Sequence, residues 1–220
     1  MTRIIAGAYR GRRLATPTGE DTRPTADRVR EAMFSGLDAT HVLYGRRFLD
    51  LYAGSGAVGL EAASRGAEHV LLVESDPRAI RVIRENIAAL DASGVVSLAT
   101  HRVASVLAAG PPAATFRDRA PTNGPGASAS DSASASDSAS ASDSASASRF
   151  DVVFADPPYA ASEVEITAML SALADYGWLN AGALVILERS KRSPAPIWVP
   201  SVTAERSRRY GETMLWYGRR

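Results

Sequence analysis

A short apolar strand that runs into a glycine-rich turn constrains the fold of this chain more than any other feature. Residues 48–52 read Phe-Leu-Asp-Leu-Tyr, which is typical of a buried strand, and residues 53–59 follow as a glycine-rich turn that opens a helix. A further apolar strand at residues 69–74 ends in Glu74, twenty positions after Gly54. This spacing places a carboxylate at the tip of the next strand, within reach of a ribose diol.

Strands and helices alternate along the rest of the chain. The apolar pattern predicts strands at residues 48–52, 69–74, 95–100, 150–155 and 183–188, and helices at 27 to about 37, at 57–65, from Pro77 through Leu90, in a short piece ending at Ala109, and after the Ser162–Glu165 capping box. Residues 197–202 and 213–217 read as a C-terminal antiparallel hairpin around Tyr210 and Gly211. The alternation predicts a mostly parallel sheet with helices on both faces, whose ligands bind at the carboxyl ends of the strands.

The sequence Asp156-Pro157-Pro158-Tyr159 follows the apolar run 150–155 directly. Two prolines stiffen this turn, so that the Asp156 carboxylate and the Pro157 carbonyl can face a common point as acceptors. Tyr159 adds a flat face, and together these groups suit the exocyclic amine of a nucleobase. The same residues would also form an ordinary Pro-Pro turn after a buried strand, with Tyr159 merely packed.

Asp50 separates two classes of ligand for the glycine-rich turn. A pyrophosphate binds at a helix N-terminus, and a carboxylate four residues before Gly54 would repel it, which argues against a dinucleotide. S-adenosylmethionine carries an ammonium group that Asp50 could pair with, while Glu74 holds its ribose. The chain therefore resembles a class I S-adenosylmethionine-dependent methyltransferase, with the glycine motif before the Asp-Pro-Pro-Tyr motif as in amino-methylating members.

The N-terminal residues narrow this resemblance. Residues 3–7, 10–14 and 22–34, with Arg-Pro-Thr at 23–25, are similar to the bacterial family that methylates guanine N2 in 16S ribosomal RNA of the small subunit. The resemblance implies a seven-stranded Rossmann-like fold with a small N-terminal β-hairpin, a monomer, and an acceptor in the small ribosomal subunit. It also implies that the loop with Arg23 and Thr25 closes over the cofactor, although Thr25 could instead be an ordinary helix N-cap.

The resemblance assigns roles to the remaining motif residues. It implies catalytic roles for Asp156, Pro157 and Tyr159, and cofactor binding by Asp50, Tyr52, Gly54, Gly56, Glu74, Ser75, Arg23 and Thr25. Related enzymes often hold the adenine amine with an acidic or amide side chain after the third or fourth strand, but residues 102–105 here read Arg-Val-Ala-Ser. No residue is therefore assigned to the adenine ring.

Basic residues gather at the two ends of the chain. Residues 1–47 carry nine arginines against five acids, and residues 189–220 carry eight basic residues against two acids, although the whole chain has a net charge of only +1. Such ends are expected to contact phosphate around an acidic core that holds the cofactor. The RNA-binding candidates are Arg3, Arg10, Arg12, Arg13, Arg208 and Arg209, and the alternative for each is an ordinary solvated side chain.

A low-complexity insertion at residues 111–148 divides the expected domain. From Ser130 the sequence repeats small polar residues with a period of six, and these cannot offset the entropy of ordering, so we expect a disordered loop. Residues 1–38 are expected to form a basic hairpin and helix, and residues 39–220 the methyltransferase domain. Calcium binding by the aspartates of the repeat is disfavoured, because a site needs several oxygens held together.

Composition excludes several classes of function. The chain has no cysteine, and its three histidines lie in unrelated segments, so no metal site is expected. It has no apolar stretch of membrane-spanning length, which predicts a cytoplasmic protein. The alternatives that remain are an adenine-N6 DNA methyltransferase, a nicotinamide-dependent oxidoreductase disfavoured by Asp50, and a non-catalytic RNA-binding assembly factor.

Overall fold

The computed structural model describes residues 2–17, 24–40, 42–112 and 149–220, with the side chains of residues 24–26 left out. Arg23 and residues 113–148 of the insertion therefore lie outside the described residues, as does the side chain of Thr25. The predicted disorder of the insertion and the predicted closure of the loop with Arg23 stay predictions.

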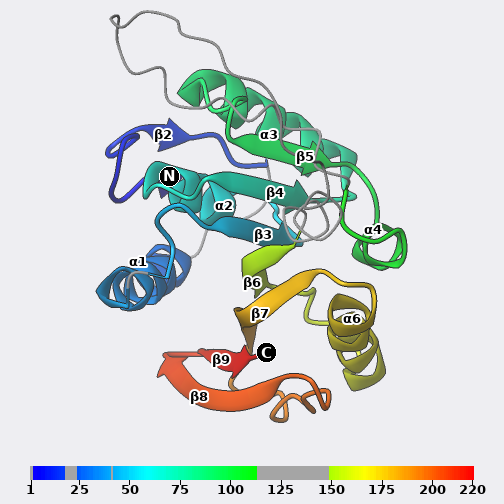
Figure 1. Ribbon diagram of the computed structural model, residues 1–220. Helices are drawn as coiled ribbons and strands as arrows, with labels where there is room; N and C mark the ends of the chain where they lie inside the picture. Colours follow the sequence, from blue (N-terminus) through cyan, green and yellow to red (C-terminus); the bar gives the residue numbers. More distant parts are fainter. Residues whose placement is uncertain (1, 18–23, 41, 113–148) are drawn as a thin grey trace, which may run out of the picture.

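A seven-stranded sheet in the order β5-β4-β3-β6-β7-β9-β8 forms the centre of the protein (Figure 1). Neighbouring strands are parallel from β5 to β7, and β9 is antiparallel to both β7 and β8. The strands are β3 (Arg47–Leu51), β4 (His69–Val73), β5 (Val96–Ala99), β6 (Phe150–Ala155), β7 (Leu179–Ser190), β8 (Thr203–Tyr210) and β9 (Thr213–Arg219). The predicted mostly parallel sheet of seven strands is confirmed.

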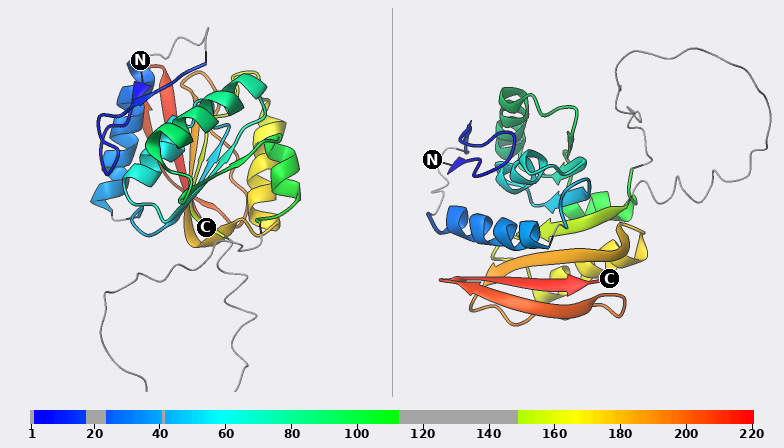
Figure 2. Two further views of the ribbon diagram at one scale, coloured as in Figure 1. Left: turned by 90° about the horizontal axis from the view of Figure 1, so that it is seen from above. Right: turned by 60° about the vertical axis from the view of Figure 1, so that its left-hand side comes forward.

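Helices cover both faces of the sheet, as Figure 2 shows. Alternate residues of the central strands belong to different cores: Val152 and Phe154 of β6 pack in one cluster, and Val153 and Ala155 in the other. The first cluster includes residues of the helices α1 (Pro24–Ala39), α2 (Ala57–Ser64) and α3 (Pro77–Leu90). The second cluster includes residues of the helices α4 (Val103–Ala108) and α6 (Glu163–Asp175).

Two helices begin where capping residues predict. The Asp76 side chain accepts a hydrogen bond from Arg78 N at 3.0 Å at the start of α3. Ser162 and Glu165 form a reciprocal capping box at the start of α6. In contrast, α1 begins at Pro24. Thr25 is therefore the second residue of the helix and does not occupy the N-cap position, which precedes the first helical residue.

The N-terminal hairpin, with β1 (Thr2–Arg3) paired to β2 (Arg13–Leu14), docks on α2 through polar contacts. The buried Glu61 carboxylate accepts hydrogen bonds from Ile5 N at 2.7 Å and Ala6 N at 3.0 Å. Gly7 lies so close to α2 that an added Cβ would fall 1.8 Å from the carbonyl oxygen of Ser64. The predicted small hairpin is thus present, and α2 holds it in place.

The predicted C-terminal hairpin is present, but its first strand was placed wrongly. The prediction used the apolar residues 197–202, whereas β8 covers Thr203–Tyr210, a polar strand of mostly exposed residues at the edge of the sheet. Trp198, Val199 and Val202 instead pack with the second core cluster. Their apolar character therefore reflects contact with the sheet and not membership of it.

The insertion joins the fold at the edge of the sheet opposite the carboxyl ends of the parallel strands. Trp178, which precedes β7, donates from Nε1 to the carbonyl oxygen of Leu107 in α4 at 3.0 Å. Its own carbonyl accepts from Phe150 N, the first residue of β6, at 2.8 Å. These contacts place both flanks of the insertion near the amino ends of β6 and β7.

Replacing residues 113–148 by a short Gly-Ser linker is expected to leave the predicted methyl-transfer activity intact, because the linker would lie at the edge away from Asp156. The melting temperature and the transfer of labelled methyl groups would be compared with those of the full chain. A shortened protein that melts at the same temperature but no longer transfers methyl would contradict this expectation.

Candidate active site

Three predicted site residues lie side by side at the carboxyl edge of the sheet. In the strand pairing, Leu51 is opposite both Val73 and Ala155, the last residues of β4 and β6. The residues that follow these three are Tyr52, Glu74 and Asp156. The alignment continues beyond the strands, because Ala53 N donates to the carbonyl of Val73 at 3.0 Å and Asp156 N to that of Leu51 at 3.4 Å.

The glycine-rich turn is hydrogen-bonded to Glu74, which follows Gly54 by the predicted twenty positions. Gly54 N donates to Oε2 of Glu74 at 2.8 Å, and the other carboxylate oxygen accepts from Ser75 N at 2.6 Å and Asp76 N at 2.8 Å. Gly54 has a φ of 56°, and a Cβ added to it would meet no atom of the described residues within 4 Å. The turn therefore presents bare backbone to open space beside a fixed carboxylate.

Asp50 lies beneath this turn and is only 1% exposed. Its Oδ2 accepts a hydrogen bond at 2.8 Å from the backbone N of Gly59, the third residue of α2. Such an N–H at a helix start lacks a partner within its own helix, so Asp50 caps α2 from the neighbouring strand. The close fit requires glycine, since a Cβ on Gly59 would lie 2.2 Å from Leu72.

The three carboxylates lie close enough to influence one another. Burial raises the pKa of Asp50 to about 8, and the hydrogen bond from Gly59 opposes this rise. The negative charges of Asp156 and Glu74 push the pKa of Asp50 in the same direction as burial. The carboxyl of Asp50 therefore holds its proton more tightly than an exposed aspartate, and a positive charge nearby would favour its ionised form.

Tyr52 carries strained backbone at the point where β3 meets the glycine-rich turn. Its φ of 63° lies in the left-handed region, which costs a non-glycine residue on the order of 1–3 kcal/mol. The side chain is half-buried, and burial, helped by the charge of Glu165 in α6, raises the pKa of its phenol. Tyr52 therefore lies between the glycine-rich turn and the start of α6.

The Asp-Pro-Pro-Tyr turn leaves the same edge of the sheet from β6. Asp156 is exposed and Pro157 is buried, which fixes the turn against the protein. Ala161 N donates to the carbonyl of Pro158 at 2.9 Å and closes the turn just before α6. Tyr159 is 71% exposed, so much of its side chain is accessible to solvent.

Sequence reasoning missed Asn86, a buried residue of α3 that is 2% exposed. Its side chain donates to the carbonyl oxygens of Ser55 and Ala15, both at 3.0 Å, and accepts from Ala15 N at 2.8 Å. It therefore joins the glycine-rich turn to the segment that precedes the Arg-Pro-Thr motif. Its place on a predicted helix gave no signal of this role, because the two partners lie 71 and 31 residues away in the chain.

Comparison with known proteins places this arrangement in a family. The family described as "Conserved hypothetical protein 95" matches residues 2–116 and 126–219. The ribosomal RNA small subunit methyltransferase D of Escherichia coli K12 is 31% identical over 194 residues, which is 88% of this chain and 77% of that protein. Its counterpart in Haemophilus influenzae is 30% identical over 192 residues, 87% of this chain and 80% of that protein. The chain belongs to this family.

Solved structures agree with the family and with the fold. A structure from Escherichia coli, described provisionally as methyltransferase yhhF, superposes with a TM-score of 0.73 at 29% identity, covering 100% of this chain and 97% of that chain. Magnesium protoporphyrin IX methyltransferase from Synechocystis, solved with bound S-adenosylmethionine, gives 0.59 at 14% identity, covering 91% and 82%. The second likeness concerns the fold alone, which is the predicted Rossmann-like methyltransferase fold.

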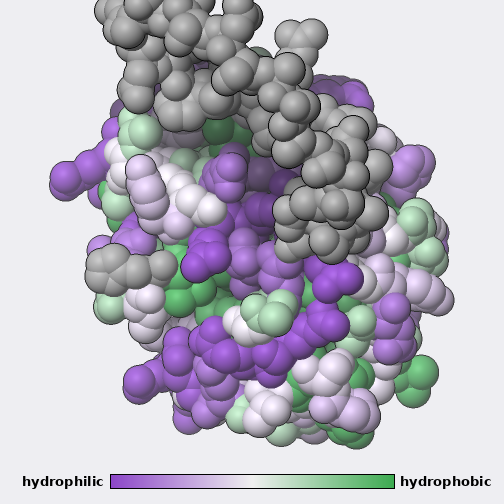
Figure 3. Space-filling model, viewed as in Figure 1, coloured by the Kyte–Doolittle hydropathy of each residue, from purple (hydrophilic) through white to green (hydrophobic). Residues whose placement is uncertain are grey.

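The arginine candidates lie on two separate elements, the N-terminal hairpin and β8. Arg3, Arg10, Arg12 and Arg13 are exposed on the N-terminal hairpin, and Arg12 donates to the carbonyl of Ala89 at the end of α3. Arg208 and Arg209 are exposed on β8, where Figure 3 shows hydrophilic side chains gathered over the lower edge of the sheet.

The pairing register places Arg208 level with the active-site edge. Arg208 is opposite Leu215, which is opposite Glu188, the residue after the partner of Ala155. Arg208 therefore lies three strands from Asp156, a distance of about 14 Å along the edge.

Within the described ranges, no group of histidine, aspartate and glutamate residues could hold a metal ion. His69 is buried in β4, where burial, helped by the positive charge of Arg47, lowers its pKa to about 4. His101 is exposed, and His41 lies outside the described residues. Nor does any helix of the described chain have the length and apolar character to cross a membrane.

The raised pKa of Asp50 predicts how stability depends on pH. The folded value of about 8 lies above the unfolded value near 3.9, so between these pH values the folded chain holds a proton that the unfolded chain releases. This contribution to stability is complete below about pH 4 and is lost as pH rises through about 8, at up to about 1.4 kcal/mol per pH unit. The Asp50→Asn variant should therefore gain stability relative to the parent protein between about pH 5 and about pH 8 in urea unfolding. Parallel pH profiles for the two proteins would contradict a bound proton.

Proposed function

We propose that this protein transfers a methyl group from S-adenosylmethionine to the exocyclic N2 of a guanine in 16S ribosomal RNA of the small subunit. One observation carries the proposal: Tyr52, Glu74 and Asp156 leave three neighbouring strands at one level of the sheet. Family membership supports ribosomal RNA as the acceptor, since its relatives are named for methylation of that RNA. A core alone would not require these polar groups at one edge.

The residues of the glycine-rich turn fit S-adenosylmethionine. Glu74 is held by three backbone N–H groups, and Oε2, which receives one of them, retains a lone pair for a ribose hydroxyl. Gly54 leaves open space beside it, and Gly56 begins α2 with a φ of 78°. The charge of Asp50 favours the ammonium group of the cofactor, and its capping of α2 removes an N–H that a phosphate would need. Ser75 is a further exposed candidate at the same strand end, and Arg23 and Thr25 stay candidates from the sequence.

The Asp-Pro-Pro-Tyr turn orients the acceptor amine. Asp156 and the Pro157 carbonyl accept the two N–H groups of the amine, and Tyr159 stacks on the base. S-adenosylmethionine, when bound, supplies an electrophilic methyl group and leaves as the neutral thioether. Conjugation with the ring makes the amine a weak nucleophile, so its placement and the polarisation of its N–H bonds provide most of the acceleration. The product nitrogen then loses one proton to Asp156 or to water.

The two sets of arginines, on the N-terminal hairpin and on β8, bind the RNA backbone. Salt-dependent phosphate contacts from the hairpin and from β8 would position the RNA, while the base pocket selects the amine. The buried contacts of Glu61 with Ile5 and Ala6 keep the hairpin in one orientation, which lowers the entropy lost on binding.

Ribosomal RNA from cells that lack the gene should lose one N2-methylguanosine, and the purified protein should restore it when given S-adenosylmethionine. Nucleoside mass spectrometry of the 16S RNA measures both results. The appearance of N6-methyladenosine in DNA instead would transfer the proposal to an adenine methyltransferase. An RNA that is bound but never methylated would indicate a non-catalytic assembly factor.

Changing Asp156 to Ala should lower turnover at least a hundredfold, because the amine loses a charged acceptor where charge develops. The affinity for S-adenosylmethionine, measured by calorimetry, should stay within a few fold, since Glu74 and the glycine-rich turn are untouched. The matched variant Asp175→Ala, at the far end of α6, controls for loss of a surface carboxylate. Unchanged turnover in Asp156→Ala would remove this residue from the mechanism.

A further inference from the structure

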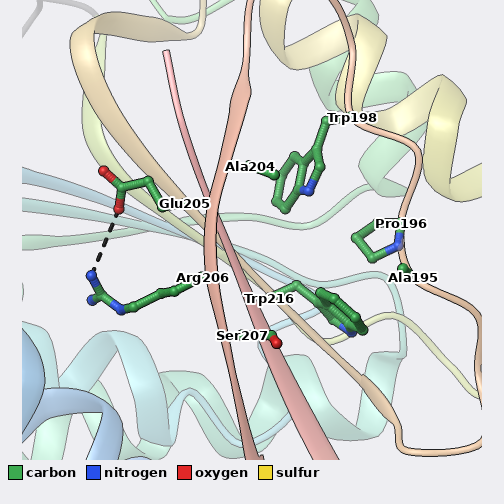
Figure 4. A pocket seen from close by; sticks show the side chains of 8 residues that line it. All are labelled: Ala195, Pro196, Trp198, Ala204, Glu205, Arg206, Ser207 and Trp216. Atoms are coloured by element: carbon green, nitrogen blue, oxygen red, sulfur yellow. Dashed lines mark ion pairs between the residues drawn. The ribbon is translucent and has the colours of Figure 1, made fainter.

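A second aromatic site lies on the C-terminal part of the sheet, away from the Asp-Pro-Pro-Tyr turn (Figure 4). There a cavity of about 310 Å³ is bordered by the segment before β8 and by β8 and β9. Two tryptophans lie beside it, Trp198 from the segment and Trp216 from β9, and both are partly exposed. We call the space between them the tryptophan slot.

The two tryptophans lie over the same face of β9. The Trp198 ring lies against Gly218, where an added Cβ would fall 2.6 Å from one of its ring carbons. Gly218 and Trp216 are two residues apart on the same strand, so they share one face, and their backbone positions are about 7 Å apart. A flat aromatic ligand in the cavity would therefore meet both indole rings.

The lining of the slot carries no unpaired negative charge. The one acid that borders the cavity, Glu205, is paired with Arg206 and Arg219, so it does not repel an anionic chain.

Positive charge on the same face matches a phosphate next to that base. Ser207 is opposite Trp216 in the strand pairing, and Arg209 follows two positions later on β8. Arg209 therefore projects from the same face as the slot, about 7 Å further along the strand. It donates from Nε to the carbonyl of Gly211 at 3.1 Å, which leaves its other guanidinium N–H groups for a ligand.

We propose that the tryptophan slot binds a second, unpaired base of the RNA substrate, stacked between Trp198 and Trp216, with its phosphate at Arg209. This inference rests on the proposed RNA substrate but concerns a base that is not methylated. The slot would hold the RNA on the outer strands while the target guanine enters beside Asp156. Sequence-tolerant stacking of this kind is common in proteins that bind single strands.

Tryptophan fluorescence tests the slot without any methyl transfer. The chain has three tryptophans, and Trp178 is fully buried, so a bound base should quench Trp198 and Trp216 alone. The probe is a short single-stranded oligoadenylate, and the matched probe is an abasic oligonucleotide of the same length. We expect quenching by the first and not by the second. No base-dependent quenching up to about 1 mM would overturn the proposal.

Variants separate stacking from charge. Trp198→Ala and Trp216→Ala should each weaken oligoadenylate binding roughly tenfold or more, and Trp198→Phe should retain most of the affinity. Arg209→Gln should weaken binding of both probes alike. Tyr44→Ala, which removes an aromatic residue that is 81% exposed on the loop before β3, should leave binding unchanged. Melting temperatures check that each variant is folded, and equal affinities of the parent and both tryptophan variants would overturn the slot.

The outcomes distinguish this inference from the proposed function. Base-dependent quenching without any N2-methylguanosine in the mass spectra would retain the slot and remove the guanine assignment. Methylation of the expected guanine with no base-dependent quenching would retain the guanine assignment and remove the slot.

Discussion

One buried hydrogen bond, from Gly59 N to the carboxyl of Asp50, organises the active edge of the sheet. It secures the start of α2 to β3, and the glycine-rich turn must therefore bend back over the strand ends. That bend brings Gly54 N to Glu74, which fixes the second carboxylate. Because Asp50 is almost fully buried, its negative charge destabilises the folded protein unless the carboxyl is protonated or a cation lies next to it. The same group thus shapes the edge and favours a positively charged ligand.

Local patterns predicted most of this edge. The strand that precedes Asp156 was predicted at 150–155, which is the extent of β6, because a run of five apolar residues, interrupted only by Asp151, meets a proline turn there. The Ser162–Glu165 capping box and the Asp76 cap also lie where the sequence places them. Such features depend on residues within a few positions of each other, so a single sequence carries the information.

Contacts between distant segments could not be predicted in this way. Asn86 reaches the turn at Ser55 and the segment at Ala15, and nothing near Asn86 in the sequence marks either partner. The polar strand β8 was missed for a related reason: its arginines and serine show no apolar alternation, since an edge strand with exposed side chains buries little. Apolar residues 197–202 then took its place in the prediction, although they cover the sheet from outside.

The two elements that carry the arginine candidates, the N-terminal hairpin and β8, are held in place by different kinds of contact. A hairpin with two-residue strands has too few contacts to be stable alone, so its orientation depends on Glu61 and Ser64 of α2. In contrast, β8 is paired with β9 along most of its length. Because α2 and β9 both contribute to the same core cluster, both elements are attached to the sheet that carries Asp156. If the arginines bind phosphate as proposed, the RNA backbone would be held at two separated points of one core, which would restrict the orientations of the RNA.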